Sequence, residues 1–332
     1  GVVSDCVVQS GVVESDGGLN SIRAGGICGT NSGELSGSFS NGASVTVSND
    51  SADAFAGGIL GYSTASLEMN AAVNTGNVSS SSSSSSYDSY SGGLVGYGVG
   101  TVTVSNSYNT GYVSSSPSGY SSGYSGGLVG YGSGTVTVTD SCNMGNVSSS
   151  YYSSCSGGIV GHGDGDVTVT DSCNTGNVSS SSSGYQSGYS GGLVGHGVGT
   201  VTVSNSYNTG YVSSSRSGYS SGYSGGLVGY GRSSVTVTDS YNTGNVSGDN
   251  YSGGLVGYGR SSVTVSNSYN TGNVSGDYSG GLVGVGDDTV TVSNSYARRG
   301  YRSSASGISG SLKPEAELRE RATFTNWDFS EV

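Results

Sequence analysis

A glycine-rich pentapeptide recurs along almost the whole chain, and this repeat limits the possible folds more than any other feature. Its pattern is Gly-Gly-(Leu/Ile)-(Val/Leu/Cys)-Gly, and it begins at Gly25, Gly57, Gly92, Gly126, Gly157, Gly191, Gly225, Gly253 and Gly280. A repeat of this length is typical of solenoid architectures, in which each unit buries its apolar face only against its neighbours.

Within each unit, short runs of β type are separated by Gly, Asn and Ser. The run Val263-Thr-Val265 alternates apolar and polar residues, which favours a strand with one buried face. Stacking such strands from unit to unit builds a continuous core. The sequence therefore predicts an all-β parallel β-helix (β-solenoid) of about ten stacked turns over residues 1–311. Residues 312–332 are expected to form a short C-terminal cap or interdomain joint with helical and aromatic character, including Phe324, Trp327 and Phe329.

Alignment of the repeats places similar residues in columns. One column is expected to form a hydrogen-bonded ladder from turn to turn, and it contains Asn109, Asn143, Asn174, Asn208, Asn242 and Asn270. The preceding position is apolar or aromatic and predicts an inward or corner stack of Cys6, Phe39, Val73, Tyr108, Cys142, Cys173, Tyr207, Tyr241, Tyr269 and Tyr296. A further column, just before the glycines, contains Tyr90, Tyr124, Cys155, Tyr189, Tyr223, Tyr251 and Tyr278.

The glycines of the repeat are expected at tight corners that need either a positive φ or a close approach of two backbones. The length of the repeat varies in one place. There, Ser/Gly/Tyr-rich insertions are predicted to be loops along one edge of the rod, at 79–89, 114–123, 148–154, 179–188 and 213–222.

The charge distribution excludes several kinds of partner. The formal net charge is −12, and the basic residues before residue 298 are Arg23, Arg216, Arg232 and Arg260. So few cations cannot neutralise nucleic-acid phosphates or an anionic membrane surface. No segment approaches the roughly 20 apolar residues of a membrane span. We therefore expect neither nucleic-acid binding nor membrane insertion.

The motif Gly253-Gly-Leu-Val-Gly257 is followed by Asn-Ser-Tyr-Asn-Thr-Gly-Asn-Val. These motifs, together with the tail from Lys313 to Phe329, resemble the GLUG-repeat family of prokaryotic cell-surface and secreted β-helical proteins. The resemblance covers nearly the whole chain. It implies a large surface protein or adhesin that carries a β-helical stalk, and hence a secreted or cell-surface location.

Five cysteines offer several disulfide pairings. Cys142 and Cys173 hold equivalent positions in consecutive turns, so their Cα atoms are expected within the disulfide range. Cys142–Cys155 and Cys155–Cys173 are alternatives, and Cys6 could pair with Cys28 in the first turn. An odd cysteine is left over, which could crosslink neighbouring molecules.

His162 and His196 also lie in consecutive turns, in a column with Tyr97, Tyr131, Tyr230 and Tyr258. A bound metal needs more ligands than two stacked imidazoles. We therefore expect these histidines to be aromatic replacements, and we predict neither a metal nor a cofactor. The acidic residues are scattered, and no nucleophile–base pair is visible, so the sequence indicates a chain that is not an enzyme.

Two functions remain from these observations. The first is a structural rod that associates with copies of itself into a fibre, sheath or cell-surface layer, which near-identical turns favour. The second is the stalk of an adhesin whose Tyr/Ser loops bind a surface glycan or protein partner. Ice binding is a minor alternative, because an outward Thr array is predicted from the pairs 101/103, 135/137, 200/202 and 289/291; Asp166, Ser234 and Ser262 interrupt its first column.

Overall fold

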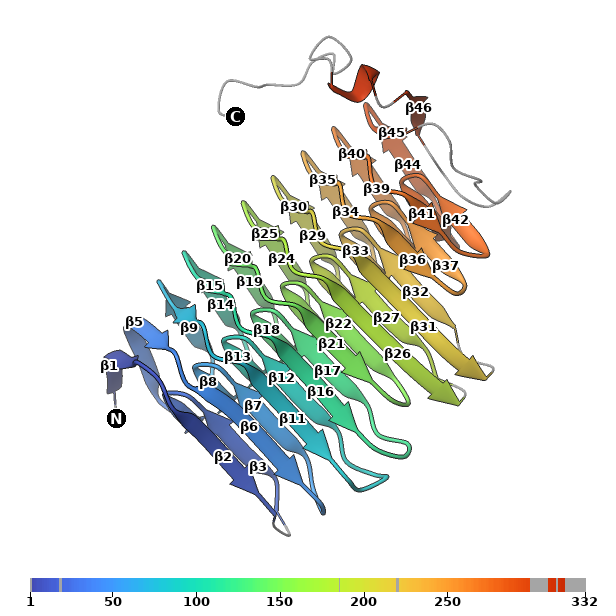
Figure 1. The fold of residues 1–332 in the computed structure, drawn as a ribbon. Helices are drawn as coiled ribbons and strands as arrows, with labels where there is room; N and C mark the ends of the chain where they lie inside the picture. The colour runs from blue at the N-terminus through green and yellow to red at the C-terminus, as the bar shows by residue number, and fades with distance from the viewer. Residues whose placement is uncertain are drawn as a thin grey trace.

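The computed structural model describes residues 2–17, 20–184, 186–218, 221–298, 310–314 and 316–319. The chain passes through the same series of short strands in every coil, and equivalent strands of successive coils pair in parallel (Figure 1). The fold is therefore an all-β parallel solenoid, as predicted. Three of its sheets contain nine strands each, so the described residues form nine coils, close to the expected number.

Five sheets, named A to E here in chain order within a coil, run along the solenoid. Sheet A contains β1 (Val2–Val8), β5 (Glu34–Asn41), β10 (Val73–Asn74), β15 (Tyr108–Asn109), β20 (Cys142–Asn143), β25 (Cys173–Asn174), β30 (Tyr207–Asn208), β35 (Tyr241–Asn242), β40 (Tyr269–Asn270), β45 (Tyr296–Arg298) and β46 (Ser311–Lys313). Sheet B contains β2 (Val12–Asp16), β6 (Ser44–Asn49), β11 (Val78–Ser82), β16 (Val113–Pro117), β21 (Val147–Ser150), β26 (Val178–Gly184), β31 (Val212–Gly218), β36 (Val246–Gly248) and β41 (Val274–Ser275).

The other three sheets complete each coil. Sheet C contains β3 (Ile22–Gly25), β7 (Ala54–Gly57), β12 (Ser89–Gly92), β17 (Gly123–Gly126), β22 (Ser154–Gly157), β27 (Gly188–Gly191), β32 (Gly222–Gly225), β37 (Tyr251–Gly253) and β42 (Tyr278–Gly280). Sheet D contains β4 (Cys28–Asn31), β8 (Leu60–Ser63), β13 (Val95–Gly98), β18 (Val129–Gly132), β23 (Val160–Gly163), β28 (Val194–Gly197), β33 (Val228–Gly231), β38 (Val256–Gly259) and β43 (Val283–Gly286). Sheet E contains β9 (Leu67–Asn70), β14 (Val102–Ser105), β19 (Val136–Thr139), β24 (Val167–Thr170), β29 (Val201–Ser204), β34 (Val235–Thr238), β39 (Val263–Ser266) and β44 (Val290–Ser293).

Sheets C and D meet at the Gly-Gly-Leu-Val-Gly corner. None of the glycines in these motifs, all of which are described, has a positive φ, so backbone conformation is not the reason for glycine at these positions. The close approach of backbones is confirmed. A Cβ on Gly192 would overlap the carbonyl oxygen of Gly226 in the next coil and would lie 2.5 Å from Cγ of Asn208. Glycine is needed here because the coils leave no room for a side chain.

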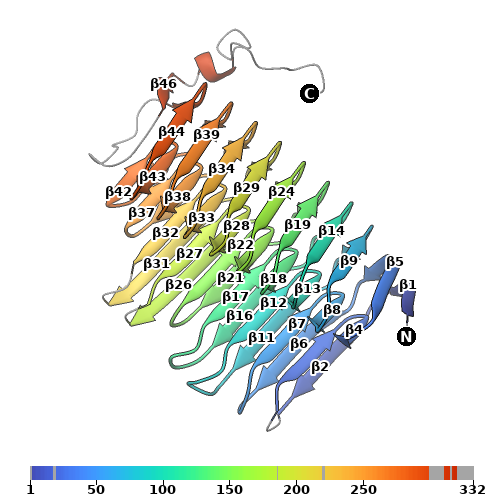
Figure 2. The same cartoon turned by 180° about the vertical axis from the view of Figure 1, so that it is seen from behind.

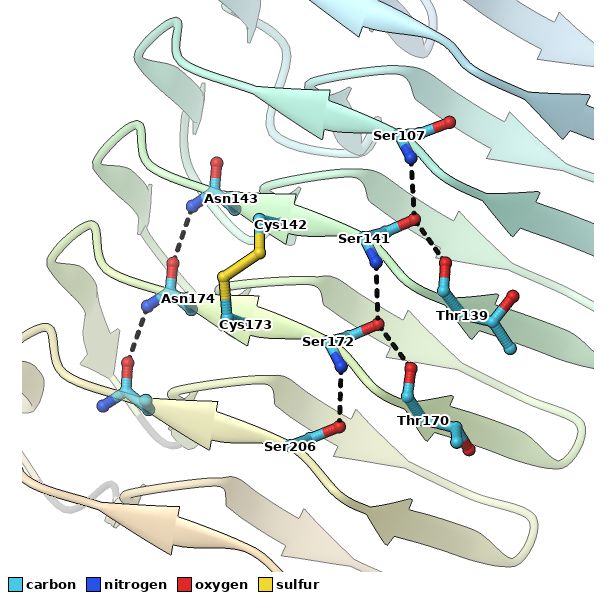
Figure 3. The surroundings of a disulfide bond; sticks show 11 residues. Ser107, Thr139, Ser141, Cys142, Asn143, Thr170, Ser172, Cys173, Asn174 and Ser206 are labelled. Atoms are coloured by element: carbon cyan, nitrogen blue, oxygen red, sulfur yellow. Dashed lines mark hydrogen bonds between the residues drawn. A yellow bond between two sulfur atoms is a disulfide. The ribbon is translucent and has the colours of Figure 1, made fainter. Parts of the chain in front are cut away.

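The positive φ falls at the corner between sheets E and A. Asn and Asp tolerate this left-handed conformation better than other residues with a side chain. The column has φ between 43° and 49° and contains Asn106, Asp140, Asp171, Asn205, Asp239, Asn267 and Asn294. A serine follows each of them and closes the turn: the hydroxyl of Ser141 donates to the Thr139 carbonyl at 2.6 Å, and its backbone N–H donates to Oγ of Ser172 at 3.2 Å (Figure 3).

The interior has an apolar part and a polar part. Sheets D and E face each other across a continuous cluster of Leu, Ile and Val, to which the Leu or Ile of every repeat after the first contributes a fully buried side chain. Between sheets B and C the interior is lined mainly by serine from β11 and β12 onward, whereas in the first coils it holds an apolar cluster that includes Val45, Val47 and Ala54. Ser180 and Ser190 approach to 2.8 Å between their Oγ atoms, and Ser190 also donates to the Ser213 carbonyl of the next coil at 2.6 Å. The same Ser–Ser contact occurs in four further coils.

The prediction that the Ser-rich insertions are loops is wrong for their first residues. These residues extend the strands of sheet B, as in β26 (Val178–Gly184) and β31 (Val212–Gly218). Alternate serines point inward, and the hydroxyl groups of Ser180 and Ser214, for example, contact facing serines of sheet C. The last residue of each insertion already begins a strand of sheet C, so the described connections are shorter than predicted; they lie along one edge of the solenoid (Figures 1 and 2).

The C-terminal segment continues sheet A before it turns. Strand β46 pairs in parallel with β45, and the Ser311 N–H donates to the Ser295 carbonyl at 3.1 Å. A short 3-10 helix, η1 (Glu317–Arg319), follows, and Leu318 is buried against Tyr296. The predicted aromatic residues of the cap, Phe324, Trp327 and Phe329, lie outside the described residues. No helix in the described part of the chain is long and apolar enough to cross a bilayer.

Candidate functional site

The predicted asparagine column forms a buried ladder inside sheet A. Each side-chain Nδ2 donates to a carbonyl two residues further along and, in all but the last coil of the ladder, to Oδ1 of the asparagine in the next coil. For Asn174 both distances are 2.7 Å, to the Gly176 carbonyl and to Asn208. The ladder starts two coils earlier than expected and contains Asn41, Asn74, Asn109, Asn143, Asn174, Asn208, Asn242 and Asn270. All eight side chains are 0% exposed.

The neighbouring column places its side chains on the opposite face of the same strands. The rings of Tyr207, Tyr241 and Tyr269 are stacked at 4.9 and 5.0 Å between centroids, and all three are half-buried. The column is therefore a corner stack and not an inward one. Two of its predicted members, Cys6 and Phe39, are wrong. Val73 pairs with Ser40 and not with Phe39, and Cys6 pairs with Phe39, so both residues lie one position before this column. Phe39 consequently points into the core, where it is 1% exposed.

Cys142 and Cys173 occupy this corner column, and a disulfide joins them across two adjacent coils (Figure 3). Their Cα atoms lie 4.6 Å apart, because the two residues are direct partners in the parallel register. The alternative pairings with Cys155 are wrong, since Cys155 lies on β22 in sheet C with a free thiol. The pairing of Cys6 with Cys28 is also wrong: both are free thiols, on sheets A and D, and each donates to a carbonyl two residues away.

Alkylation of the chain tests this pairing. In denaturant without reductant, iodoacetamide is expected to modify three of the five cysteines, because two are held in the disulfide. After reduction all five are expected to react. Intact mass spectrometry counts the added groups. Cys142→Ser is expected to give four modified thiols without reductant, and an unchanged count of three in that variant would contradict the assignment.

Two aromatic columns pack against each other across the Gly-Gly-Leu corner. The column on sheet C includes Tyr90 and Tyr124, and the column on sheet D includes Tyr97 and Tyr131. Rings within a column are parallel, as for Tyr97 and Tyr131 at 4.8 Å and 5°, whereas rings of different columns meet edge to face, as for Tyr124 and Tyr131 at 86°. Such edge-to-face contacts add to the stability beyond the burial of area.

The regular pattern is interrupted where Cys155 replaces a tyrosine on sheet C and His162 and His196 replace tyrosines on sheet D. The three side chains gather there, and one ligand atom from each lies within 4.8 Å of the other two. The Cys155 Sγ is 3.8 Å from His162 Nδ1. Cys155 is 1% exposed and His162 is 7% exposed. We call this group the Cys–His cluster.

A carboxylate orients one of the imidazoles. Asp164 Oδ1 lies 3.0 Å from His162 Nε2, and Tyr131 donates to the other carboxylate oxygen at 2.6 Å. The hydrogen bond from His162 holds the pKa of Asp164 below its ordinary value. Burial raises the pKa of the Cys155 thiol and lowers the pKa of His196 well below its usual range. Both of these groups are therefore neutral near pH 7.

Sequence reasoning missed this cluster because it considered the two histidines without a cysteine neighbour. A usable signal was present in the spacing. Cys155 precedes His162 by the same seven positions that separate Tyr90 from Tyr97 and Tyr124 from Tyr131. Those tyrosine pairs are in contact in the structure, so an aligned cysteine and histidine at that spacing indicate contact as well.

The outward side of sheet E is a hydroxyl-bearing face. From β14 through β44 its two outward positions carry only Thr or Ser. One column is threonine in seven successive coils, in the order Thr103, Thr137, Thr168, Thr202, Thr236, Thr264 and Thr291. We call this the threonine face.

Comparison with protein-family models, with curated proteins and with solved structures finds no match for the chain.

Proposed function

We propose that the chain is a non-catalytic extracellular structural protein whose rigid solenoid associates side by side with copies of itself into a fibre, sheath or cell-surface layer. The observation that carries this proposal is the threonine face. It repeats without a charged residue from β14 to β44. Two such faces can meet without removing a charge from water, which is the largest cost of burying a polar surface.

Regular stacking supports the same proposal energetically. A contact between two rods recurs in every coil, because equivalent side chains lie in register along the solenoid. A contribution that is small for one coil is therefore added over the length of the face, as in stacked β assemblies. The GLUG-like motifs agree with a secreted or surface location, which is part of the proposal.

Electron microscopy and light scattering over rising protein concentration test self-association. Regular fibres, sheets or tubes are expected from the parent chain. A double variant, Thr202→Glu with Thr236→Glu, is expected to stay dispersed because it places two like charges on the threonine face. The matched control, Ser213→Glu with Ser247→Glu, adds the same charge on outward positions of sheet B in the same region and is expected to assemble. Isolated rods at every concentration would overturn the proposal.

A second candidate is the stalk of an adhesin that binds a surface glycan or protein partner. The observation in its favour is the exposure of tyrosines beside the connections between sheets B and C. Tyr120 is 74% exposed, and Tyr87 and Tyr151 are 39% and 44% exposed. Dispersed parent rods in the microscopy experiment would favour this candidate.

Ice binding is a minor candidate that rests on the same threonine face. Its first predicted column is interrupted, but the second is continuous over seven coils. The variants described above also test it: ice shaping by the parent and by the sheet B control, together with its loss in Thr202→Glu with Thr236→Glu, would favour ice binding over assembly.

A further inference from the structure

We propose that Cys155, His162 and His196 bind one zinc ion, which joins two adjacent coils in the middle of the solenoid. Thiolate and imidazole are the ligands that zinc prefers in proteins, usually with tetrahedral geometry. The three protein ligands leave a fourth position for a water molecule. The proposal is independent of self-association, because the cluster lies between the aromatic columns of sheets C and D, whereas the threonine face belongs to sheet E.

The first argument is the distance between two of the ligand atoms. A tetrahedral zinc ion with a Zn–S bond of about 2.3 Å and a Zn–N bond of about 2.0 Å places sulfur and nitrogen about 3.5 Å apart. Cys155 Sγ and His162 Nδ1 are 3.8 Å apart. A hydrogen bond between thiol and imidazole at this distance is weak, whereas a shared metal ion needs almost no movement of either residue.

The second argument is the tautomer of His162. The Asp164 carboxylate accepts a hydrogen bond from His162 Nε2 at 3.0 Å. A proton held on Nε2 leaves the lone pair on Nδ1, which is the nitrogen that faces Cys155. A carboxylate on the far nitrogen is the usual arrangement around a metal-binding histidine, since it fixes the ring and makes the ligand nitrogen more basic.

The third argument is the orientation of His196. Rings in the sheet D column are normally parallel, and His162 follows this rule by stacking on Tyr131 at 5°. His196 departs from it. Its ring is nearly perpendicular to those of its column neighbours, at 83° to His162 and 84° to Tyr230, and instead lies at 23° to Tyr189 of the other column. The imidazole is therefore turned relative to its own column, beside the position where Cys155 replaces a tyrosine.

His196 also has an unsatisfied polar atom. Its Nε2 is buried and has no hydrogen-bond partner among the described residues. Leaving such an atom unpaired is destabilising, and a metal bond is one way to satisfy an imidazole nitrogen in this setting.

The proposed ion would strengthen the same joint that the disulfide holds. Cys142, Cys155 and His162 belong to one coil, β20 to β24, while Cys173 and His196 belong to the next, β25 to β29. The disulfide joins these two coils at sheet A, and the ion would join them at sheets C and D. Since a solenoid is stabilised mainly by contacts between neighbouring units, two such links reinforce this joint.

Zinc titration of the full chain tests the proposal, after chelator treatment in buffer without reductant so that the disulfide is preserved. We expect one equivalent of zinc to bind, as followed by competition with a chromogenic chelator. Cobalt(II) in its place is expected to give a thiolate-to-cobalt charge-transfer band, which reports a metal–sulfur bond directly.

Three variants define the ligands. Cys155→Tyr and His196→Tyr each restore the residue found in neighbouring coils, so they are expected to fold and to lower zinc affinity at least 100-fold. Asp164→Ala is expected to weaken binding by about 10- to 100-fold while keeping the charge-transfer band, because it only positions His162. The matched control, Cys28→Ser, removes a free thiol elsewhere and should leave binding unchanged. Absence of zinc binding, or unchanged affinity in Cys155→Tyr, would overturn the proposal and leave only a thiol–imidazole contact.

Discussion

Replacing Gly191 with alanine is expected to open the solenoid locally and to destabilise it by about 3 kcal/mol or more. The added Cβ would overlap the carbonyl oxygen of Val194 within its own corner. It would also lie 2.5 Å from the Val194 carbonyl carbon and 2.7 Å from the Gly229 nitrogen of the next coil. These are backbone atoms, so no side chain can rotate away to relieve the overlap.

The matched control is Gly188→Ala in the same strand, β27. The nearest atoms to its added Cβ are serine hydroxyls at 3.1, 3.3 and 3.5 Å, which can adjust. The equivalent position is already Ala54 or Ser89 in other coils. We therefore expect Gly188→Ala to change the stability by less than about 1 kcal/mol.

Hydrogen exchange is the appropriate measurement, since global unfolding of a long repeat protein is not a two-state process. Amides of β27, β28 and β33 are expected to lose protection in Gly191→Ala, while those of β8 and β13 keep it. Equal protection in the two alanine variants would show that the corner relaxes without cost and would contradict the steric argument.

The repeat alone was enough to predict the solenoid and most of its register. Every coil carries the same motif, so aligning the motifs is equivalent to stacking the strands, and the asparagine ladder follows from the alignment. The alignment failed where this periodicity breaks. The first coils differ in sequence, and there the alignment placed Cys6 and Phe39 one residue away from the position that pairs with Val73.

Other features depend on which columns touch, and the sequence does not state this. The positive φ values belong to Asn and Asp beside a serine and not to the repeated glycines, because a glycine can be required by space as well as by backbone conformation. The serine-lined interior was mistaken for loops, since hydroxyl pairs such as Ser180 and Ser190 give no apolar pattern. Predicting the Cys–His cluster likewise requires knowing that the aromatic columns of sheets C and D are in contact.

Replacing Asn242 with leucine is expected to destabilise the coils around β35 by about 3 kcal/mol or more, because it removes three buried hydrogen bonds. Its Nδ2 donates to the Gly244 carbonyl at 2.7 Å and to Asn270 at 2.8 Å, and its Oδ1 accepts from Asn208 at 2.8 Å. Leucine has a similar shape but no polar atoms. The matched control is Asn245→Leu in the same coil, where the side chain is exposed and water replaces the lost contact.

A double variant separates a ladder from a set of independent asparagines. Asn208→Leu and Asn242→Leu each remove the hydrogen bond between these two residues, so the double variant loses it only once. The destabilisation of the double variant, measured by hydrogen exchange, is therefore expected to be smaller than the sum of the single effects by about 1–3 kcal/mol. Strict additivity would contradict coupling between the coils. If the asparagines are coupled, each one stabilises the neighbouring coils as well as its own. The loss of one asparagine then weakens the coils on both sides of it.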